Sequence, residues 1–181
     1  NLLDVREQLS GGTIGTLVRA AAGADDSGLS STKGDLNGDR LTDVLIGAPQ
    51  ARNARGSIHL LAGSATYSGD LDLRAFSQEQ VLGAIDGRAG ALRFGSSLAN
   101  IGDFNGDGRD DYAVGASGFT DDDGRVYILH GPEANSWRNV ISVTSLINDG
   151  HGIMISGNSG ERLGTAVSSI GDVNGDGLAD V

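Results

Sequence analysis

The sequence of 181 residues contains no cysteine, which excludes disulfide bonds, a thiolate metal site and a cysteine nucleophile. Only 4% of the residues are aromatic, and only two are proline. No apolar run approaches the roughly 18 residues that a membrane-spanning helix needs, and the chain does not open on a basic segment followed by an apolar one. We therefore expect any signal peptide or membrane anchor of the protein to lie outside this segment.

Positive charge is also scarce, because 13 Lys and Arg residues stand against 24 Asp and Glu residues. The formal net charge is −11 and the pI is about 4.4, which argues against nucleic acid or an anionic membrane surface as a partner. Lys33 is the only lysine, and no Gly-x-x-x-x-Gly-Lys pattern occurs, so a P-loop is excluded. Glycine is abundant, with 30 residues, which favours turns and short strands over long helices.

An acidic pattern in the middle of the chain indicates a cation site. Asp103, Asn105, Asp107 and Asp111 stand at positions 1, 3, 5 and 9 of a short stretch, and the backbone carbonyl of Arg109 stands at position 7. Oxygen atoms at alternate positions of a tightly turned backbone can converge on one hard cation, and Ca²⁺ takes six to eight oxygen ligands. Glycines at positions 4 and 6 permit the positive φ angles that such a turn needs.

The same spacing occurs three times, which a simple surface turn does not require. Asn-Gly and Asp-Gly pairs alone also indicate hairpin turns, so a single copy would leave that alternative open. With three copies, the sequence predicts up to three bound Ca²⁺ ions. The predicted ligands are Asp35, Asn37, Asp39, Leu41 and Asp43 in the first copy, Asp103, Asn105, Asp107, Arg109 and Asp111 in the second, and Asp172, Asn174, Asp176, Leu178 and Asp180 in the third.

The copies are separated by 68 and 69 residues, the length of one supersecondary unit in a repeat protein. We expect one domain over residues 1–181, with units at about 27–93, 94–162 and 163–181, the last truncated, and residues 1–26 as the tail of a preceding unit. Within a unit, apolar runs bounded by glycine predict four short strands. The predicted strands are residues 13–20, 28–33, 44–49, 57–61, 79–83, 94–101, 112–117, 125–129, 152–156 and 163–170.

Four strands per repeated unit are typical of a β-propeller blade, so the predicted fold class is all-β, with about 2.6 units of a longer propeller. The succession of Phe94-Gly95, the acidic stretch and Gly115-Ala116 resembles the FG-GAP repeat of the integrin α-subunit propeller and of related bacterial and secreted proteins. The sequence departs from that pattern at four places: Ser117 replaces a proline, Leu163 replaces the phenylalanine, no aromatic residue precedes Gly28, and Arg40 replaces a glycine of the acidic stretch.

Other chemistry fits the sequence less well. An EF-hand or dockerin needs a carboxylate at position 12 and a following helix, but Ile46 and Val114 stand there, within predicted strands. The three histidines, His59, His130 and His151, are far apart in sequence, and no Gly-x-Ser-x-Gly elbow is present. We therefore expect no catalytic residues.

The resemblance implies a calcium-binding module of a cell-surface or secreted protein that mediates adhesion or binds an extracellular protein or glycan. The remaining propeller blades of the parent chain would be further partners. The alternative is a non-catalytic propeller attached to a secreted enzyme, such as a phospholipase or a polysaccharide-degrading protein.

Overall fold

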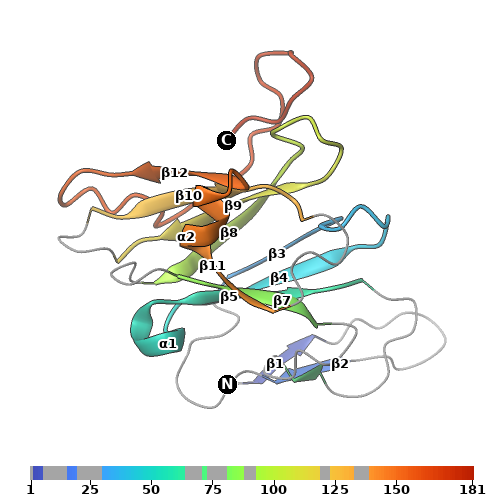
Figure 1. Cartoon of the computed structure of the whole chain (residues 1–181), viewed down its shortest axis with the longest axis vertical. Helices are drawn as coiled ribbons and strands as arrows, with labels where there is room; N and C mark the ends of the chain where they lie inside the picture. Colours follow the sequence, from blue (N-terminus) through green and yellow to red (C-terminus); the bar gives the residue numbers. More distant parts are fainter. Residues whose placement is uncertain are drawn as a thin grey trace.

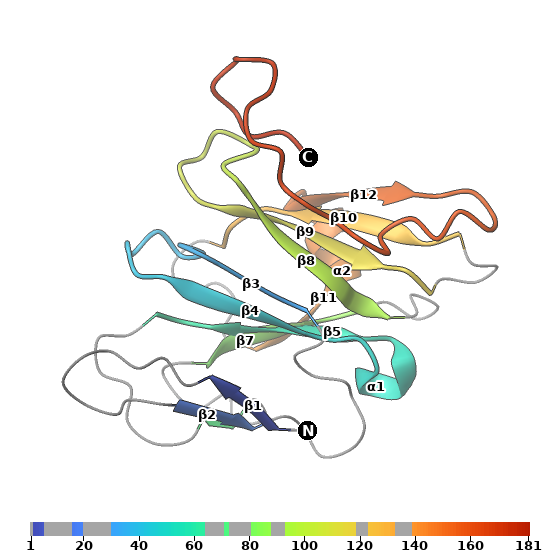
Figure 2. The same ribbon diagram turned by 180° about the vertical axis from the view of Figure 1, so that it is seen from behind.

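The computed structural model describes residues 2–5, 16–19, 30–63, 71–72, 81–87, 93–118, 123–132 and 139–181. In this part of the chain the molecule is built almost entirely of short strands that form three sheets (Figures 1 and 2). The elements are β1 (Leu2–Val5), β2 (Thr16–Arg19), β3 (Ser31–Gly34), β4 (Asp43–Ala48), α1 (Ala51–Ala54), β5 (Ser57–Leu61), β6 (Leu71–Asp72), β7 (Val81–Asp86), β8 (Phe94–Gly102), β9 (Asp111–Ala116), β10 (Arg125–Leu129), β11 (Val140–Ser142), α2 (Val143–Asn148) and β12 (Gly152–Ser156).

The second unit forms a four-stranded antiparallel blade in the order β12-β10-β9-β8. Its strands are the four that the sequence predicts for the second unit. On one face of the blade, Val126 lies opposite Gly115 and Ile128 lies opposite Ala113, so these two apolar residues of β10 face small residues of β9. The prediction of propeller blades is confirmed here strand by strand.

The first unit forms the same blade, in the order β7-β5-β4-β3, and adds a fifth strand. Strands β3, β4, β5 and β7 pair antiparallel, as in the second blade. Strand β11 belongs to the second unit in sequence, but it pairs parallel with β7, with Val140 opposite Ala84. The second unit therefore contributes the outer edge of the first blade, and helix α2 returns the chain to its own blade.

The third sheet contains β1, β2 and β6. Strand β2 lies within the predicted strand at residues 13–20. Strand β1 lies in the first ten residues, for which the sequence predicts neither a helix nor a strand. Residues 13–15, 20, 28–29 and 79–80 of the predicted strands lie outside the described residues.

Phe94 holds the two blades together in a shared apolar core. Its ring is fully buried and meets the ring of Tyr127 edge to face, with ring centroids 5.3 Å apart. Such a pair contributes about 0.5–1.5 kcal/mol beyond the burial of its area. The same cluster joins Leu45, Ile58, Leu60 and Ile85 of the first blade to Tyr112, Val114 and Leu129 of the second.

Glycine lets the blades approach through their backbones. A Cβ atom added to Gly115 would lie 2.0 Å from the carbonyl oxygen of Gly164, and one added to Gly47 would lie 2.2 Å from that of Gly95. Real Cβ atoms essentially never approach that closely, so glycine is required at these positions. The Gly-Ala dipeptide of one unit thus packs directly against the backbone of the Phe-Gly dipeptide, or its counterpart, in the next. Leu163 takes the place of the phenylalanine in the third unit, because its bridge to Gly124 matches the bridge from Phe94 to Gly56.

The strand predicted at residues 163–170 is wrong. The segment carries only an isolated bridge at Leu163, and a further bridge joins Gly171 to Asp180. In the other units this innermost strand pairs with the strand that begins at position 9 of the acidic stretch. The sequence contains only Asp180 and Val181 of that partner, so the hydrogen bonds that would hold residues 163–170 extended are missing.

Candidate functional site

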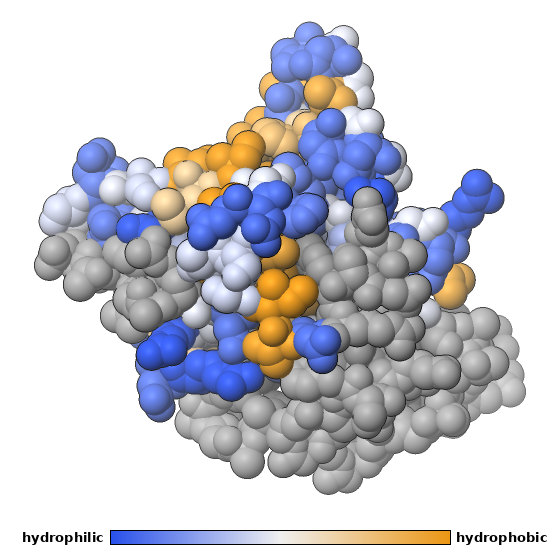
Figure 3. All heavy atoms as spheres, in the orientation of Figure 1, coloured by the Kyte–Doolittle hydropathy of each residue, from blue (hydrophilic) through white to orange (hydrophobic). Residues whose placement is uncertain are grey.

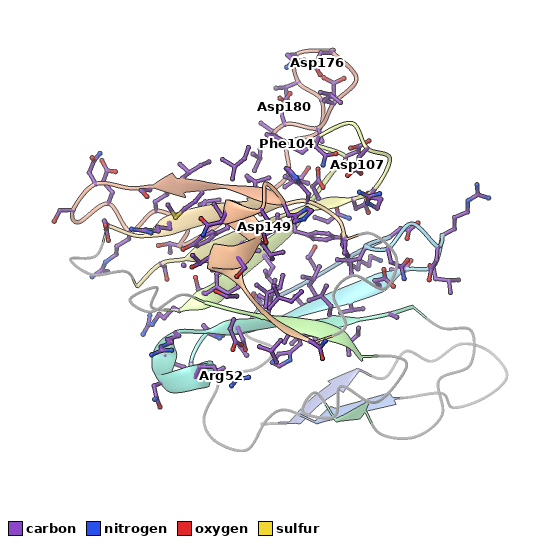
Figure 4. All side chains as sticks on the ribbon, in the orientation of Figure 1. Arg52, Phe104, Asp107, Asp149, Asp176 and Asp180 are labelled. Atoms are coloured by element: carbon purple, nitrogen blue, oxygen red, sulfur yellow. The ribbon has the colours of Figure 1, made fainter. Side chains whose placement is uncertain are left out.

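The three acidic stretches form loops at one end of the molecule. The first loop (residues 35–43) joins β3 to β4, and the second loop (residues 103–111) joins β8 to β9. The third loop (residues 172–180) contacts the second through a hydrogen bond from the N–H of Ala179 to the carbonyl of Asp103. Figure 4 shows the third loop beyond the second, with Asp180 nearer its base and Asp176 at its outer tip, away from Asp107. The first two loops lie side by side because the blades that carry them are stacked.

Position 1 of each loop binds the loop's own backbone. Asp103 accepts hydrogen bonds from the N–H groups of Gly106 at 2.7 Å, Asp107 at 3.0 Å and Gly108 at 2.8 Å. Asp172 makes the same three bonds in the third loop. Asp35 differs, because its Oδ2 atom accepts only from Arg40, while its Oδ1 atom is buried and has no hydrogen-bond partner.

Positions 3 and 5 form a repeated pair. Asn105 accepts a hydrogen bond from the N–H of Asp107 at 2.9 Å and donates one from its amide to the Asp107 carboxylate at 3.0 Å. Asn37 and Asp39 make both bonds in the first loop. The carboxylate at position 5 accepts the N–H of position 7 in all three loops. The structure thus brings positions 1, 3 and 5 onto the same turned backbone.

Position 9 is a structural anchor as well as a predicted ligand. Asp43 and Asp111 are fully buried at the first residue of β4 and β9. Asp111 accepts from Phe104 and Asn105 inside the loop and from Gly131 beyond β10, at 2.8 Å. Burial raises the pKa of both carboxyl groups above its usual range, and these backbone hydrogen bonds oppose that rise. Asp180 is more exposed and accepts from Val173.

Position 6 has a positive φ in every loop, as predicted for Gly108. The angles are 84° at Gly108, 89° at Gly177 and 69° at Arg40. Arg40 therefore holds a left-handed conformation that suits glycine and is strained for a residue with a long side chain. Gly106, at position 4, also has a positive φ, as predicted.

Sequence reasoning missed the roles of positions 2 and 7. Leu36 at position 2 is fully buried in the core between the blades, and Phe104 packs on a second cluster around Ile101. Position 2 is apolar in all three loops, and this repetition could have indicated that the residue packs in the core. At position 7, the guanidinium of Arg109 lies 2.7 Å from the carboxylate of Asp107, and its Nε donates to the carbonyl of Gly131.

The loops offer the oxygen chemistry that a hard cation requires. Each has carboxylates at positions 1, 5 and 9 and an amide oxygen at position 3, and the buried Oδ1 of Asp35 has no hydrogen-bond partner. Within the described residues, however, no three acidic or histidine side chains gather closely enough to form a metal cluster. Most of the carboxylates are instead occupied by backbone N–H groups of their own loop. The donor set fits Ca²⁺, and the ligand assignments remain predictions.

Outside the loops, the described residues present a mixed surface. Figure 3 shows hydrophilic atoms over the third loop and apolar atoms near β12, where Ile153 and Ile155 are nearly half exposed. His59 is buried in β5, with its Nε2 atom 3.4 Å from the hydroxyl of Ser57. In the described part of the chain, no helix is both long enough and apolar enough to cross a membrane.

Comparison with known proteins agrees with the blade structure. The model of the FG-GAP repeat matches residues 27–61 and 94–129. The chain is 37% identical to Integrin alpha-PS2 of Drosophila melanogaster over 169 residues, which is 86% of this chain and 10% of that protein. It is 33% identical to Integrin alpha-4 of Xenopus laevis over 147 residues, covering 81% of this chain and 13% of that protein. It is 34% identical to Integrin alpha-6 of Homo sapiens over 140 residues, covering 74% of this chain and 12% of that protein. The chain thus spans about a tenth of the length of these relatives.

Proposed function

The chain belongs to the FG-GAP repeat family, and from that premise we propose that it is a calcium-binding propeller module of a cell-surface or secreted protein, which mediates adhesion or binds an extracellular ligand. The observation that carries the proposal is the repetition of one acidic loop at the same place in successive blades. A turn that only reverses the chain needs no carboxylate at positions 1, 5 and 9 each time.

The residues that would hold calcium are those at positions 1, 3, 5 and 9, together with the carbonyl at position 7. In the first loop they are Asp35, Asn37, Asp39, Leu41 and Asp43. A bound Ca²⁺ ion supplies two positive charges, which offset the mutual repulsion of the three carboxylates. The loop contributes a turned backbone that holds these side chains on one side, and its apolar residue at position 2 fixes the turn to the core.

The proposed partners follow from the relatives and from charge. The names of the relatives identify them as integrin α subunits, so an extracellular protein or glycan is the proposed ligand, and further blades of the same propeller are the proposed neighbours. A net charge of −11 favours a ligand that does not carry strong negative charge. We also propose that the module is not an enzyme. A propeller attached to a secreted enzyme remains the alternative prediction.

Calcium stoichiometry tests the cation part of this proposal. Calorimetric titration of the chain should detect up to three Ca²⁺ ions, and Asp39→Ala, Asp107→Ala and Asp176→Ala should each remove one of them. Asp149→Ala, which removes an exposed carboxylate at the end of α2, should remove none. Equal stoichiometry in all four variants and the unchanged chain would contradict the assignment of the loops.

Attachment measurements test the adhesion part. Surfaces coated with the chain should retain cells or matrix proteins in the presence of Ca²⁺ and lose them when a chelator is added. A chain that binds Ca²⁺ but retains no extracellular partner would leave the ion sites standing and exclude the adhesive role for this segment. Hydrolysis of an ester, glycoside or phosphodiester by the purified chain would contradict the absence of catalysis.

A further inference from the structure

Two polar residues outside the predicted ligand set join the first and second loops. Asp110 stands at position 8 of the second loop, and its Oδ2 atom accepts a hydrogen bond from the backbone N–H of Asp35 at 3.0 Å. The same atom accepts from the side-chain amide of Asn100 at 2.7 Å. Asp35 is the first ligand residue of the first loop. A side chain of one loop thus holds the backbone of the next at the point where its predicted ligands begin.

Asn100 ties the same junction to strand β3. Its side-chain amide also donates to the carbonyl of Lys33 at 2.9 Å, and its backbone N–H donates to the hydroxyl of Thr32 at 2.9 Å. The contact leaves no space for a side chain at Gly34, where an added Cβ would lie 2.1 Å from the Asn100 amide and 2.4 Å from the Asp110 carboxylate. The close approach of Gly34 therefore fixes the distance between the loops.

The charges of both loops also meet at this junction. The phenol of Tyr112 is buried between the blades, and burial is the main cause that raises its pKa. The negative charges of Asp110, Asp43, Asp111 and Asp35 raise it further, so carboxylates of both loops lie within electrostatic range of one side chain. The Oδ1 atom of Asp35, which has no partner, is part of the same region.

This side-chain bridge occurs only once in the described part of the chain. The residue equivalent to Asp110 is Thr42 in the first loop and Ala179 in the third. Position 8 of the third loop still touches position 1 of the second, but it does so by a backbone hydrogen bond from Ala179 to the carbonyl of Asp103, at 3.1 Å. The first and second loops are therefore the pair in which one side chain carries the connection.

We propose that Asp110, held by Asn100, is a positioning residue that couples the first two cation sites, so that filling the second loop strengthens cation binding by the first. The proposal rests on the proposed function of the loops as cation sites. Binding through Arg109 and Asp111 fixes the backbone on both sides of Asp110, and a fixed Asp110 carboxylate holds Asp35 in place. The first loop then loses less conformational entropy when it binds its own ion.

Coupling of this kind is reciprocal, and typical factors begin at about fivefold. The test is a titration of the 181-residue chain with Ca²⁺, followed by NMR, in which the amide of Gly38 reports the first loop and the amide of Gly106 reports the second. Asp107→Ala removes a ligand of the second loop and should weaken the first site about fivefold. Asp110→Ala should weaken the first site by a similar factor, and the double variant should be no weaker than Asp110→Ala alone.

Two further variants separate positioning from charge. Asp110→Asn keeps an oxygen that can accept both hydrogen bonds, so the first site should bind nearly as tightly as in the unchanged chain. Asp149→Ala removes an equal charge outside the loops and should leave both sites unchanged. In the ion-free chain, the amide of Asp35 should exchange with solvent about tenfold faster in Asp110→Ala and at the original rate in Asp110→Asn, because the lost hydrogen bond is worth about 1.4 kcal/mol.

The outcomes that overturn the proposal are distinct. Coupling would be excluded if both loops bind calcium and Asp107→Ala changes the dissociation constant of the first loop by less than about twofold. The proposed function would then stand. Additive effects of the two alanine variants, or an Asp110→Asn variant that behaves as Asp110→Ala, would exclude Asp110 as the positioning residue. No calcium bound at either loop would overturn the proposed function and the coupling together. If Asp110→Ala does not fold, Asp107→Ala still tests the coupling, because Asp107 is exposed.

Discussion

Arg40 holds the first loop in a conformation that glycine provides in the other two. Its φ of 69° costs about 1 kcal/mol more than the same angle at glycine, and its guanidinium adds a positive charge to a loop that is proposed to bind a cation. Strain that a loop releases without an ion and holds with one lowers its affinity for the ion by the same free energy. Arg40 is therefore expected to weaken the first site.

We predict that Arg40→Gly tightens calcium binding by the first loop about fivefold. The NMR titration at Gly38 measures this affinity directly. Arg93→Gly is the matched control, because Arg93 also has a positive φ, of 66°, but lies in the turn before β8 and outside all three loops. An Arg40→Gly chain whose first site is unchanged, or a control that tightens it equally, would contradict the role given to Arg40.

Asp111 is a structural anchor of its loop in addition to being a predicted cation ligand. Its carboxylate is fully buried and satisfies three backbone N–H groups, whereas the side chain of Asp107 lies at the surface and is 28% exposed. An asparagine at position 111 would turn an N–H donor toward one of those N–H groups and leave it unsatisfied. Unsatisfied buried groups cost about 1–3 kcal/mol.

We predict that Asp111→Asn lowers the free energy of unfolding by about 2 kcal/mol in the presence of chelator. Asp107→Asn should change it by less than about 0.5 kcal/mol under the same conditions. Urea unfolding in chelator measures both values. Equal effects of the two variants would show that position 9 is a ligand only and not a structural anchor.

At the scale of the elements, contact between blades depends on small residues at fixed places. Gly115 in β9 lies against the backbone of Gly164, and Gly47 in β4 lies against that of Gly95. These pairs explain why the Phe-Gly and Gly-Ala dipeptides recur together, since each dipeptide is one side of the same contact. The two contacts are equivalent, because Gly47 and Gly115 are 68 residues apart and Gly95 and Gly164 are 69 residues apart, the length of one unit.

We predict that Gly115→Ala lowers the free energy of unfolding by more than 3 kcal/mol, because its methyl group would collide with backbone atoms that cannot move independently. Gly150→Ala is the comparison, since Gly150 has a positive φ and open space around it, and it should cost only about 1 kcal/mol. Chemical denaturation gives both numbers. A Gly115→Ala chain as stable as Gly150→Ala would exclude the backbone contact.

Most strands could be predicted from the sequence, because each is a short apolar run between glycines. The predicted strands at residues 57–61 and 152–156 coincide with β5 and β12, and the prediction at residues 94–101 is one residue shorter than β8. Strand β11 could not be predicted in the same way, since its pairing with β7 depends on where the neighbouring blade lies. The strand expected at residues 163–170 failed for a related reason, because its order depends on a partner strand.

The loops show the same division between local and long-range signals. The 1, 3, 5, 9 spacing and the positive φ at Gly106 and Gly108 follow from the local sequence. The bond from Asp110 to Asp35 does not, because it joins two residues that are 75 positions apart. Contacts of this kind become visible only when the stacking of the blades is known.

At the scale of the whole molecule, blades, loops and connections form one continuous structure. Strand β11 ties the second unit to the first blade, the shared core lies between the two blades, and the loops touch along one end (Figure 1). The first and second loops also carry their position 9 at the start of a central strand. Ions bound by the loops would therefore stabilise the stack of blades as a whole.

The melting temperature of the 181-residue chain in chelator and in Ca²⁺ tests most directly whether the repeated loops are calcium sites. At a Ca²⁺ concentration about ten times a dissociation constant of roughly 10⁻⁴–10⁻³ M, each filled loop should add about 1.4 kcal/mol. For a chain of this size that corresponds to about 3–6 °C per loop. A variant with Asp39, Asp107 and Asp176 all changed to Ala should show no shift. A melting curve of the unchanged chain that is the same in chelator and in several millimolar Ca²⁺ would contradict the assignment.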